Sequence, residues 1–505
     1  MKNIILLSLF LPLLLSAQKQ MVQTKLGPIS GIKKNGIQIF KGIPFAQAPI
    51  GQLRWKAPQP MKPWKDIKDC TLFGPSPYQP LPVPFMCWSE EYLIPKAPIS
   101  EDCLYLNVWA PKKTKQKKAV LVYIYGGGFR TGGAGCAIYD GESVAKKDVV
   151  FVSINYRVGV FGFLAHPALT KEAPYKSSGN YALLDMVAAL QWVHDNIEIF
   201  GGDPSRVTIA GQSAGAFAVN FLCASPLTKG LIHGAIAESG GSILASTLRP
   251  HLLLKEAEAQ GVAFAESLNC SNIEALRNKS SEEILKANSG LSAPIEDGYF
   301  LPNSMMDIYM RNAQNDIPTI IGWNEDDKMI GKPLPANQYI ESIRKQFGAK
   351  ANAVLALYPG NTDETAAKSQ GELSRDQTFG IQGFTWANLQ SEKGKAPVYV
   401  YSFDRKLPAS TPATDFGAFH TGEVVYAYDN LSTVNRPWLK EDHELALSMS
   451  TYWTNFAKTG NPNKAGLVAW PSYSITDKKI IHFDKKIMVD KLATEQKLIL
   501  LTSLN

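Results

Sequence analysis

"RVTIAGQSAGAFAVN" (residues 206–220) joins a run of β-forming residues to a helical pattern through a serine set among very small residues. A strand that turns directly into a helix bends sharply at the residue between them, and that residue is Ser213. Gly211, Ala214 and Gly215 relieve the crowding of such a bend, because small residues let the backbones approach closely. The segment therefore predicts a strand, a tight turn and a helix, with the Ser213 hydroxyl raised at the end of a sheet. A small-residue turn with an incidental serine is the alternative.

Strands and helical patterns alternate through most of the chain. The helical spacing is clearest in residues 180–197, and the predicted strands are almost continuously apolar: AVLVYIY (119–125), DVVFVSINYR (148–157), RVTIA (206–210), IPTIIGW (317–323) and PVYVYSF (397–403). Continuously apolar strands suit a sheet that is covered on both faces. We therefore predict an α/β fold, with a mostly parallel central sheet and helices on both faces. The sequence contains no repeat or composition break that would divide it into further domains.

Composition and charge are those of an ordinary globular protein. The 505 residues are 45% hydrophobic and 19% charged, with a net charge of +7. The densest basic run, KKTKQKK (112–118), contains no aromatic residue and precedes an apolar strand. We interpret it as a solvated loop and expect no nucleic-acid partner.

The N-terminus resembles a secretory signal. Residues 1–17 comprise a lysine, an apolar stretch at 4–15, and the small residues Ser16 and Ala17. This pattern predicts a signal peptide at 1–17, a secreted or periplasmic protein, and one domain at 18–505. An uncleaved anchor is the alternative, although the apolar stretch is short for a membrane span. No later segment is long and apolar enough to span a bilayer, so we expect no stable membrane anchor.

A serine nucleophile needs a base and an acid that orients the base. On a strand–turn–helix serine these follow in the order serine, acid, histidine. Among seven histidines, His420 fits best, because it lies in a glycine-bearing loop after the predicted strand at 397–403. A buried structural histidine is the alternative. Three acids follow another strand, and position alone does not separate them: Glu325, Asp326 and Asp327.

Three consecutive glycines follow a strand in YIYGGGFRTGG (123–133). Without side chains, their backbone N–H groups can face a tetrahedral oxyanion, and each such donor typically lowers the barrier by ~3 kcal/mol. A phosphate-binding loop is the competing interpretation, but no G-K-[ST] follows. We therefore expect an oxyanion loop here.

Nearly the whole chain resembles the type-B carboxylesterase/lipase family, which includes cholinesterases and bacterial p-nitrobenzyl esterases. The resemblance is carried by EDCLYLNVWAP (101–111), INYRVGVFGFL (154–164) and FGGDPSRVTIAGQSAG (200–215). It implies an α/β-hydrolase fold and hydrolysis of a small-molecule carboxylic ester without a metal or organic cofactor.

The resemblance also implies roles for single residues. Ser213 would be the nucleophile and His420 the base. The acid falls on Asp327, where family members have a glutamate in a D-E-G turn. Because aspartate is one methylene shorter, Asp326 remains a rival. The oxyanion donors would be the N–H groups of three residues: Gly127, Gly128 and Ala214.

Several residues near the expected site bear on substrate choice. Gln212 stands where the family usually has glutamate, and its neutral side chain weakens the case for a cationic choline ester. Glu423, three residues after His420, matches a family glutamate near the site. Trp88 is expected to form a wall of the pocket.

The resemblance implies a disulfide between Cys70 and Cys103 that would close the loop holding Trp88. The pairing of the remaining cysteines is open: Cys87, Cys136, Cys223 and Cys270.

Together these features predict a secreted serine esterase that acts through an acyl-enzyme intermediate. Lipase or amidase action on the same scaffold is an alternative. A catalytically silent adhesion protein is a further one, although such members typically lack the serine or histidine. The sequence indicates neither the ester preferred nor the oligomeric state.

Overall fold

A computed structural model describes residues 18–96, 98–246, 251–287 and 290–504. The predicted signal peptide at 1–17 lies outside the described residues. Within them, no helix is long and apolar enough to cross a membrane.

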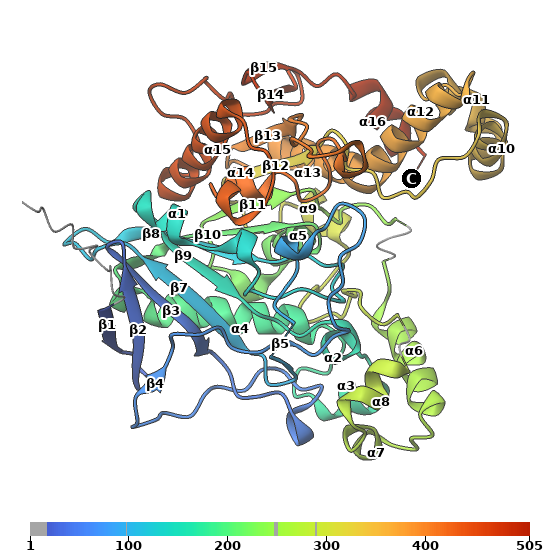
Figure 1. Ribbon diagram of the computed structural model, residues 1–505. Helices are drawn as coiled ribbons and strands as arrows, with labels where there is room; N and C mark the ends of the chain where they lie inside the picture. The colour runs from blue at the N-terminus through green and yellow to red at the C-terminus, as the bar shows by residue number, and fades with distance from the viewer. Residues whose placement is uncertain (1–17, 97, 247–250, 288–289, 505) are drawn as a thin grey trace, which may run out of the picture.

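A single large twisted sheet organises the fold (Figure 1). Its strands follow one another in space as β1 (Gln18–Gln23), β2 (Pro28–Lys34), β3 (Ile37–Pro44), β7 (Tyr105–Ala110), β9 (Val150–Ile154), β8 (Lys118–Ile124), β10 (Gly202–Gln212), β11 (Gly234–Glu238), β12 (Thr319–Asn324), β13 (Val398–Phe403), β14 (Lys479–Phe483) and β15 (Met488–Lys491). The short β4 (Lys68–Asp69) pairs with β2, and β5 (Ser76–Pro77) with β6 (Ile99–Ser100). From β9 to β14 all neighbours are parallel, whereas the strands outside this block pair antiparallel along the main path.

Helices cover both faces of this sheet. In Figure 1, α1 (Glu142–Lys146) and α15 (Lys440–Thr459) lie above it and α4 (Tyr181–Asn196) lies below. The other helices are α2 (Gly159–Phe163), α3 (Pro167–Glu172), α5 (Ala214–Ala224), α6 (Leu254–Ser267), α7 (Ile273–Arg277), α8 (Ser281–Lys286), α9 (Met305–Met310), α10 (Ala336–Phe347), α11 (Ala351–Leu357), α12 (Asp363–Arg375), α13 (Ile381–Lys393), α14 (Val424–Ala427) and α16 (Glu495–Thr502). The predicted parallel sheet between two helical layers is confirmed.

The predicted strands are buried because side chains on both of their faces meet helices. Every residue of β9, β12 and β13 is buried. The prediction for residues 148–157 was too long, because the chain leaves the sheet after Ile154 and the Asn155 side chain binds the backbone of Ala134 and Pro75. The short β11 was missed, since its residues are mostly glycine and alanine.

The predicted disulfide is absent, because Cys70 and Cys103 are both free, buried thiols. The carbonyl of Cys70 accepts a hydrogen bond from the Lys41 amide, whereas the carbonyl of Leu104, next to Cys103, accepts one from Phe45. The four cysteines whose pairing was left open are likewise free and buried.

The turn between β10 and α5 brings helix and sheet into unusually close contact. A Cβ atom on Gly215 would lie 2.0 Å from the carbonyl oxygen of Ile124 in β8, and one on Gly211 would lie 2.6 Å from the Gly215 carbonyl carbon. Both neighbours are backbone, which cannot rotate away. Glycine is therefore required at both positions.

Gly215→Ala should lower the free energy of unfolding by about 3 kcal/mol, because the new methyl group overpacks against backbone. Gly331→Ala is the matched control, since a Cβ there has nothing within 4 Å, and its effect should stay within about 0.5 kcal/mol. Urea unfolding of the two variants and the parent would measure both. Equal stability of the two variants would contradict the close-contact argument.

Candidate active site

The candidate nucleophile lies on the strained turn that the sequence predicts. Ser213 has φ +56° and ψ −124°, a conformation that residues with a side chain rarely adopt. Its amide donates to the Glu238 carbonyl at the end of β11, and its successor Ala214 begins α5. The side chain is partly exposed, whereas Gln212 and Ala214 on either side are buried. The turn therefore presents the hydroxyl at the edge of the sheet.

The glycine triplet lies directly against this turn. A Cβ on Gly126 would lie 3.0 Å from the Cβ of Ser213, and Gly127 and Gly128 have φ of +113° and +65°. Among the described residues, no hydrogen bond uses the amides of Gly127, Gly128 or Ala214. The Ala214 amide also begins a helix, where the helix dipole favours negative charge. These three donors are available to an anion beside Ser213.

The candidate base and acid are in direct contact. His420 Nδ1 lies 2.5 Å from Asp327 Oδ1, and both side chains are buried. Asp327 Oδ2 accepts hydrogen bonds from the Ser239 hydroxyl at 2.6 Å and from the Asn324 amide at 3.0 Å. The rival Asp326 instead accepts from the Ala418 amide at 2.9 Å. The structure thus brings Asp327 to His420, and the shorter side chain still makes the contact.

The topology explains this convergence. The neighbouring strands β10, β11, β12 and β13 are parallel, so their C-terminal ends meet at one edge of the sheet. The segments that follow them carry, in this order, four polar side chains: Ser213, Ser239, Asp327 and His420. Ligand and catalytic sites of open α/β sheets lie at this edge. Ser239 was missed because β11 was missed.

Aromatic rings and an amide surround His420. The Phe379 ring stacks on it with centroids 4.7 Å apart, and the Trp88 ring meets it edge-on at 6.2 Å. Gln212 Nε2 lies 3.2 Å from His420 Nε2. The Thr421 hydroxyl donates to Gln212 Oε1 and accepts from Trp88 Nε1 at 3.1 Å. Trp88 and Gln212, both predicted at the site, are thus linked to His420.

The surroundings shift the pKa of His420 upwards. Burial by itself lowers this pKa, but the negative charge of Asp327 and its hydrogen bond outweigh burial, with a further contribution from Glu423. A neutral His420 that donates from Nδ1 to Asp327 leaves Nε2 as the proton acceptor. That is the protonation state a general base requires.

Glu423, which the sequence places near the site, is fully buried. Burial raises the pKa of Glu423 to about 8, and burial likewise raises the pKa of Glu238 to about 8. Glu423 Oε1 and Glu238 Oε2 have no hydrogen-bond partner among the described residues. Both carboxyl groups are therefore mostly protonated at neutral pH. Sequence reasoning missed Glu238, which belongs to the unpredicted β11.

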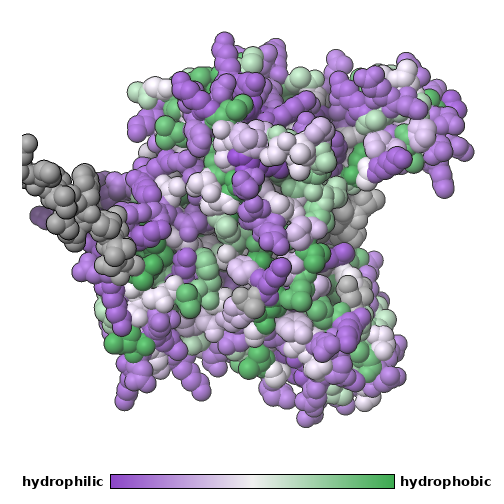
Figure 2. Space-filling model, viewed as in Figure 1, coloured by the Kyte–Doolittle hydropathy of each residue, from purple (hydrophilic) through white to green (hydrophobic). Residues whose placement is uncertain are grey.

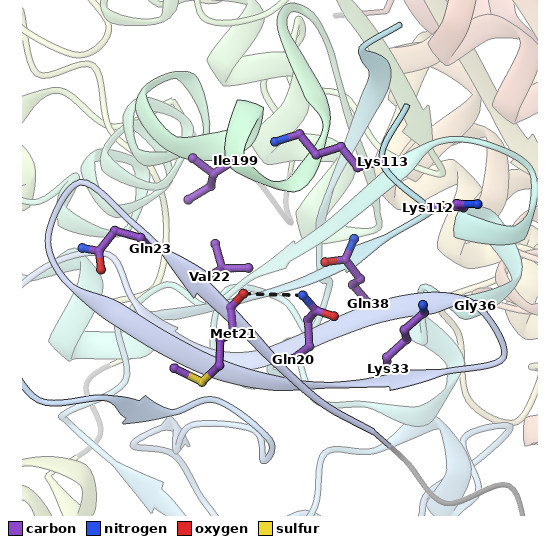
Figure 3. Close-up of a pocket in the computed structure, with 10 residues that line it drawn as sticks. All are labelled: Gln20, Met21, Val22, Gln23, Lys33, Gly36, Gln38, Lys112, Lys113 and Ile199. Carbon is purple, nitrogen blue, oxygen red and sulfur yellow. Dashed lines mark hydrogen bonds between the residues drawn. The ribbon is translucent and has the colours of Figure 1, made fainter. Parts of the chain in front are cut away.

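A solvent-exposed groove lies far from these residues. It has a volume of about 510 Å³ and lies along β1, β2 and β3, at the opposite end of the sheet from β13 (Figure 3). Figure 3 shows lysine and glutamine side chains around it, among them Lys33, Lys112 and Lys113. None of the groups that converge on Ser213 lines it. Across the described residues, no cluster of three or more His, Cys, Asp or Glu side chains is arranged to hold a metal ion.

Comparison with known proteins identifies the relatives of this arrangement. A family model described as "Carboxylesterase family" matches residues 18–500. The chain belongs to the carboxylesterase family. It is 36% identical to the fumonisin B1 esterase of Sphingopyxis macrogoltabida, over 89% of this chain and 84% of the relative. It is 33% identical to the para-nitrobenzyl esterase of Bacillus subtilis (strain 168), over 93% of this chain and 96% of the relative.

Solved structures agree with this assignment. A thermophilic PNB esterase superimposes on this carboxylesterase with a TM-score of 0.81 at 32% identity, covering 95% of this chain and 99% of that chain. The type-B family and the α/β-hydrolase fold expected from the sequence are thereby confirmed. The protein is a carboxylic ester hydrolase, and its substrates are small-molecule esters.

Glu238→Gln should make this carboxylesterase more stable at alkaline pH. The pKa of the Glu238 carboxyl is about 8 in the fold and ordinarily near 4.5. Its contribution to the free energy of unfolding is therefore fully present below pH 4.5. That contribution is lost as the pH rises through 8. Glutamine carries no charge and keeps an oxygen that can accept from Tyr428 and Trp453. The Tm of the variant should match the parent at pH 5 and exceed it by roughly 2 °C or more at pH 9.

Glu444→Gln is the matched control for this experiment, because its carboxylate is exposed on α15. It should shift Tm little at either pH. A Glu238→Gln variant that loses stability equally at pH 5 and pH 9 would contradict the buried, protonated carboxyl.

Proposed function

We propose that Ser213, His420 and Asp327 form the catalytic triad of this carboxylesterase and that hydrolysis proceeds through an acyl-enzyme. The observation that carries the proposal is the 2.5 Å contact between His420 and Asp327 at the sheet edge where Ser213 follows β10. Asp327 keeps the proton of His420 on Nδ1, so Nε2 can accept the Ser213 proton. The resting hydrogen bond between Gln212 and Nε2 gives way to the serine hydroxyl when a substrate binds.

The two half-reactions use the same groups. The Ser213 oxygen attacks the ester carbonyl while His420 takes its proton, and the amides of Gly127, Gly128 and Ala214 hold the oxyanion. Protonated His420 then donates to the departing alcohol, which leaves an acyl group on Ser213. Water, activated by His420, repeats the sequence and releases the acid. The protonated state of Glu423 supports this mechanism, because it leaves Asp327 as the charge that orients the histidine.

Three substitutions separate this triad from its alternatives. Ser213→Ala should reduce kcat by about 10⁶, and Asp327→Asn by about 10⁴, because asparagine favours the wrong histidine tautomer. Asp326→Asn is the matched control and should retain most of the activity, since Asp326 binds the Ala418 backbone. The readout is hydrolysis of p-nitrophenyl acetate, with Tm confirming that each variant is folded.

The pH profile provides an independent check on His420. Because the pKa of His420 is raised, kcat/KM of the parent should fall with decreasing pH around a midpoint above 6.5. A larger loss for Asp326→Asn than for Asp327→Asn would overturn the proposed acid.

We also propose that the protein is exported, with a signal peptide at residues 1–17 and a single catalytic domain at 18–505. The family match over residues 18–500 supports this boundary, because it begins where the apolar N-terminal segment ends. Residues 18–23 enter the sheet as β1, so the domain uses the chain from that point on.

Export predicts a mature protein that begins at Gln18. N-terminal sequencing of the protein secreted by a bacterial host would measure this directly. Recovery of the full-length chain in the membrane fraction would overturn cleavage in favour of an uncleaved anchor.

A further inference from the structure

A run of apolar side chains is exposed to solvent beside the active site. Residues 81–86 read LPVPFM, and the exposed fractions are 69% for Leu81, 66% for Val83, 55% for Phe85 and 61% for Met86. Scattered single apolar residues are normal on a surface, whereas a contiguous group indicates binding. We call residues 81–86 the apolar segment.

The backbone of this segment is held in a defined shape. Phe85 and Trp88 exchange two backbone hydrogen bonds of 3.1 and 3.0 Å, which close a tight turn with Met86 at φ +48°. Their rings also pack against each other with centroids 4.7 Å apart. Pro82 and Pro84 restrict the backbone that leads into the turn. The apolar side chains of the segment therefore stay exposed to solvent, because its backbone is fixed in this shape.

The turn connects the apolar segment to the catalytic histidine. Trp88 contacts the His420 ring, and its Nε1 donates to Thr421 Oγ1, next to His420 in the chain. Thr421 has φ +78°, a strained conformation for a β-branched residue. Figure 2 shows apolar side chains in the middle of the face that it presents.

The position beside His420 indicates which part of an ester would lie here. In the proposed mechanism His420 gives its proton to the alcohol oxygen, so the alcohol portion leaves past the side chains that surround His420. Trp88 is one of those side chains, and the apolar segment extends from it towards solvent. An alcohol that carries a long apolar chain would lie along the segment and remove its surface from water.

We propose that the apolar segment is a platform for the alcohol chain of the substrate, and that the preferred substrates are esters of extended, uncharged apolar alcohols. This inference rests on the proposed triad. Charge favours such a chain over an anionic lipid surface, because the chain between Lys68 and Lys96 carries no lysine or arginine. Lys96 itself pairs with Glu90, and Arg436, which lies by Cys87 and Glu91, donates to the Pro408 carbonyl. Neutral Gln212 beside His420 agrees with an uncharged alcohol.

Two isomeric esters test the inference. Hexyl butyrate and ethyl octanoate have the same composition but carry the long chain on opposite sides of the ester bond. The double variant Val83→Ser, Phe85→Ser should lower kcat/KM about tenfold for hexyl butyrate and less than threefold for ethyl octanoate and ethyl butyrate. The matched control is Leu447→Ser, Ile499→Ser, since these residues are exposed on α15 and α16. It should change none of the three values. Rates are measured both below and above the solubility limit of each ester, and the expected values refer to the range below it.

The outcomes are distinct. Equal losses on both isomers, or no loss on hexyl butyrate, would overturn the platform. A selective loss that occurs only above the solubility limit would also overturn it, in favour of docking to a lipid surface. If the parent chain hydrolyses no ester and Ser213 resists labelling by an organophosphonate, the proposed triad fails instead.

Discussion

The close contact between α5 and β8 is the constraint on which the active site depends. At Gly215 the helix backbone lies so near Ile124 that a single methyl group would overlap a carbonyl oxygen. Because the helix cannot move away, the residue between β10 and α5 must take a positive φ, and Ser213 does so. The buried strands on either side of β10, β8 and β11, hold Ser213 in this strained conformation. The same contact brings the glycine triplet, which follows β8, against the serine.

The charge of each buried carboxyl at the site depends on whether hydrogen-bond donors reach its oxygens. Three carboxyl groups are fully buried around the site: Asp327 and Glu423 act on His420, and Glu238 belongs to the residue whose carbonyl accepts from the Ser213 amide. Asp327 has hydrogen-bond donors on both oxygens, so its negative charge is satisfied. The other two each have an oxygen without a partner, and burial keeps them mostly protonated at neutral pH. Asp327 is therefore the main negative charge that raises the pKa of His420, and Glu423 adds to it only where its own carboxyl is ionised.

The side chains around His420 also connect the candidate active site to the surface of the protein. Trp88, Thr421 and Gln212 form a hydrogen-bonded series from the exposed turn to the imidazole. No disulfide closes the segment that carries Trp88, so noncovalent contacts alone hold it beside the histidine.

The sequence by itself determined the local features of the site. The strand–turn–helix around Ser213, the glycines after β8 and the buried strands could all be predicted, because each depends on steric demands within a short stretch. Tertiary structure decided what depends on distance in space. It brought Asp327 rather than Asp326 to His420 and left Cys70 and Cys103 as free thiols, because contacts between segments far apart in the chain depend on the assembled fold. It also raised the pKa of Glu423 and of Glu238 to about 8, because the pKa of a carboxyl depends on burial, which only the assembled fold creates.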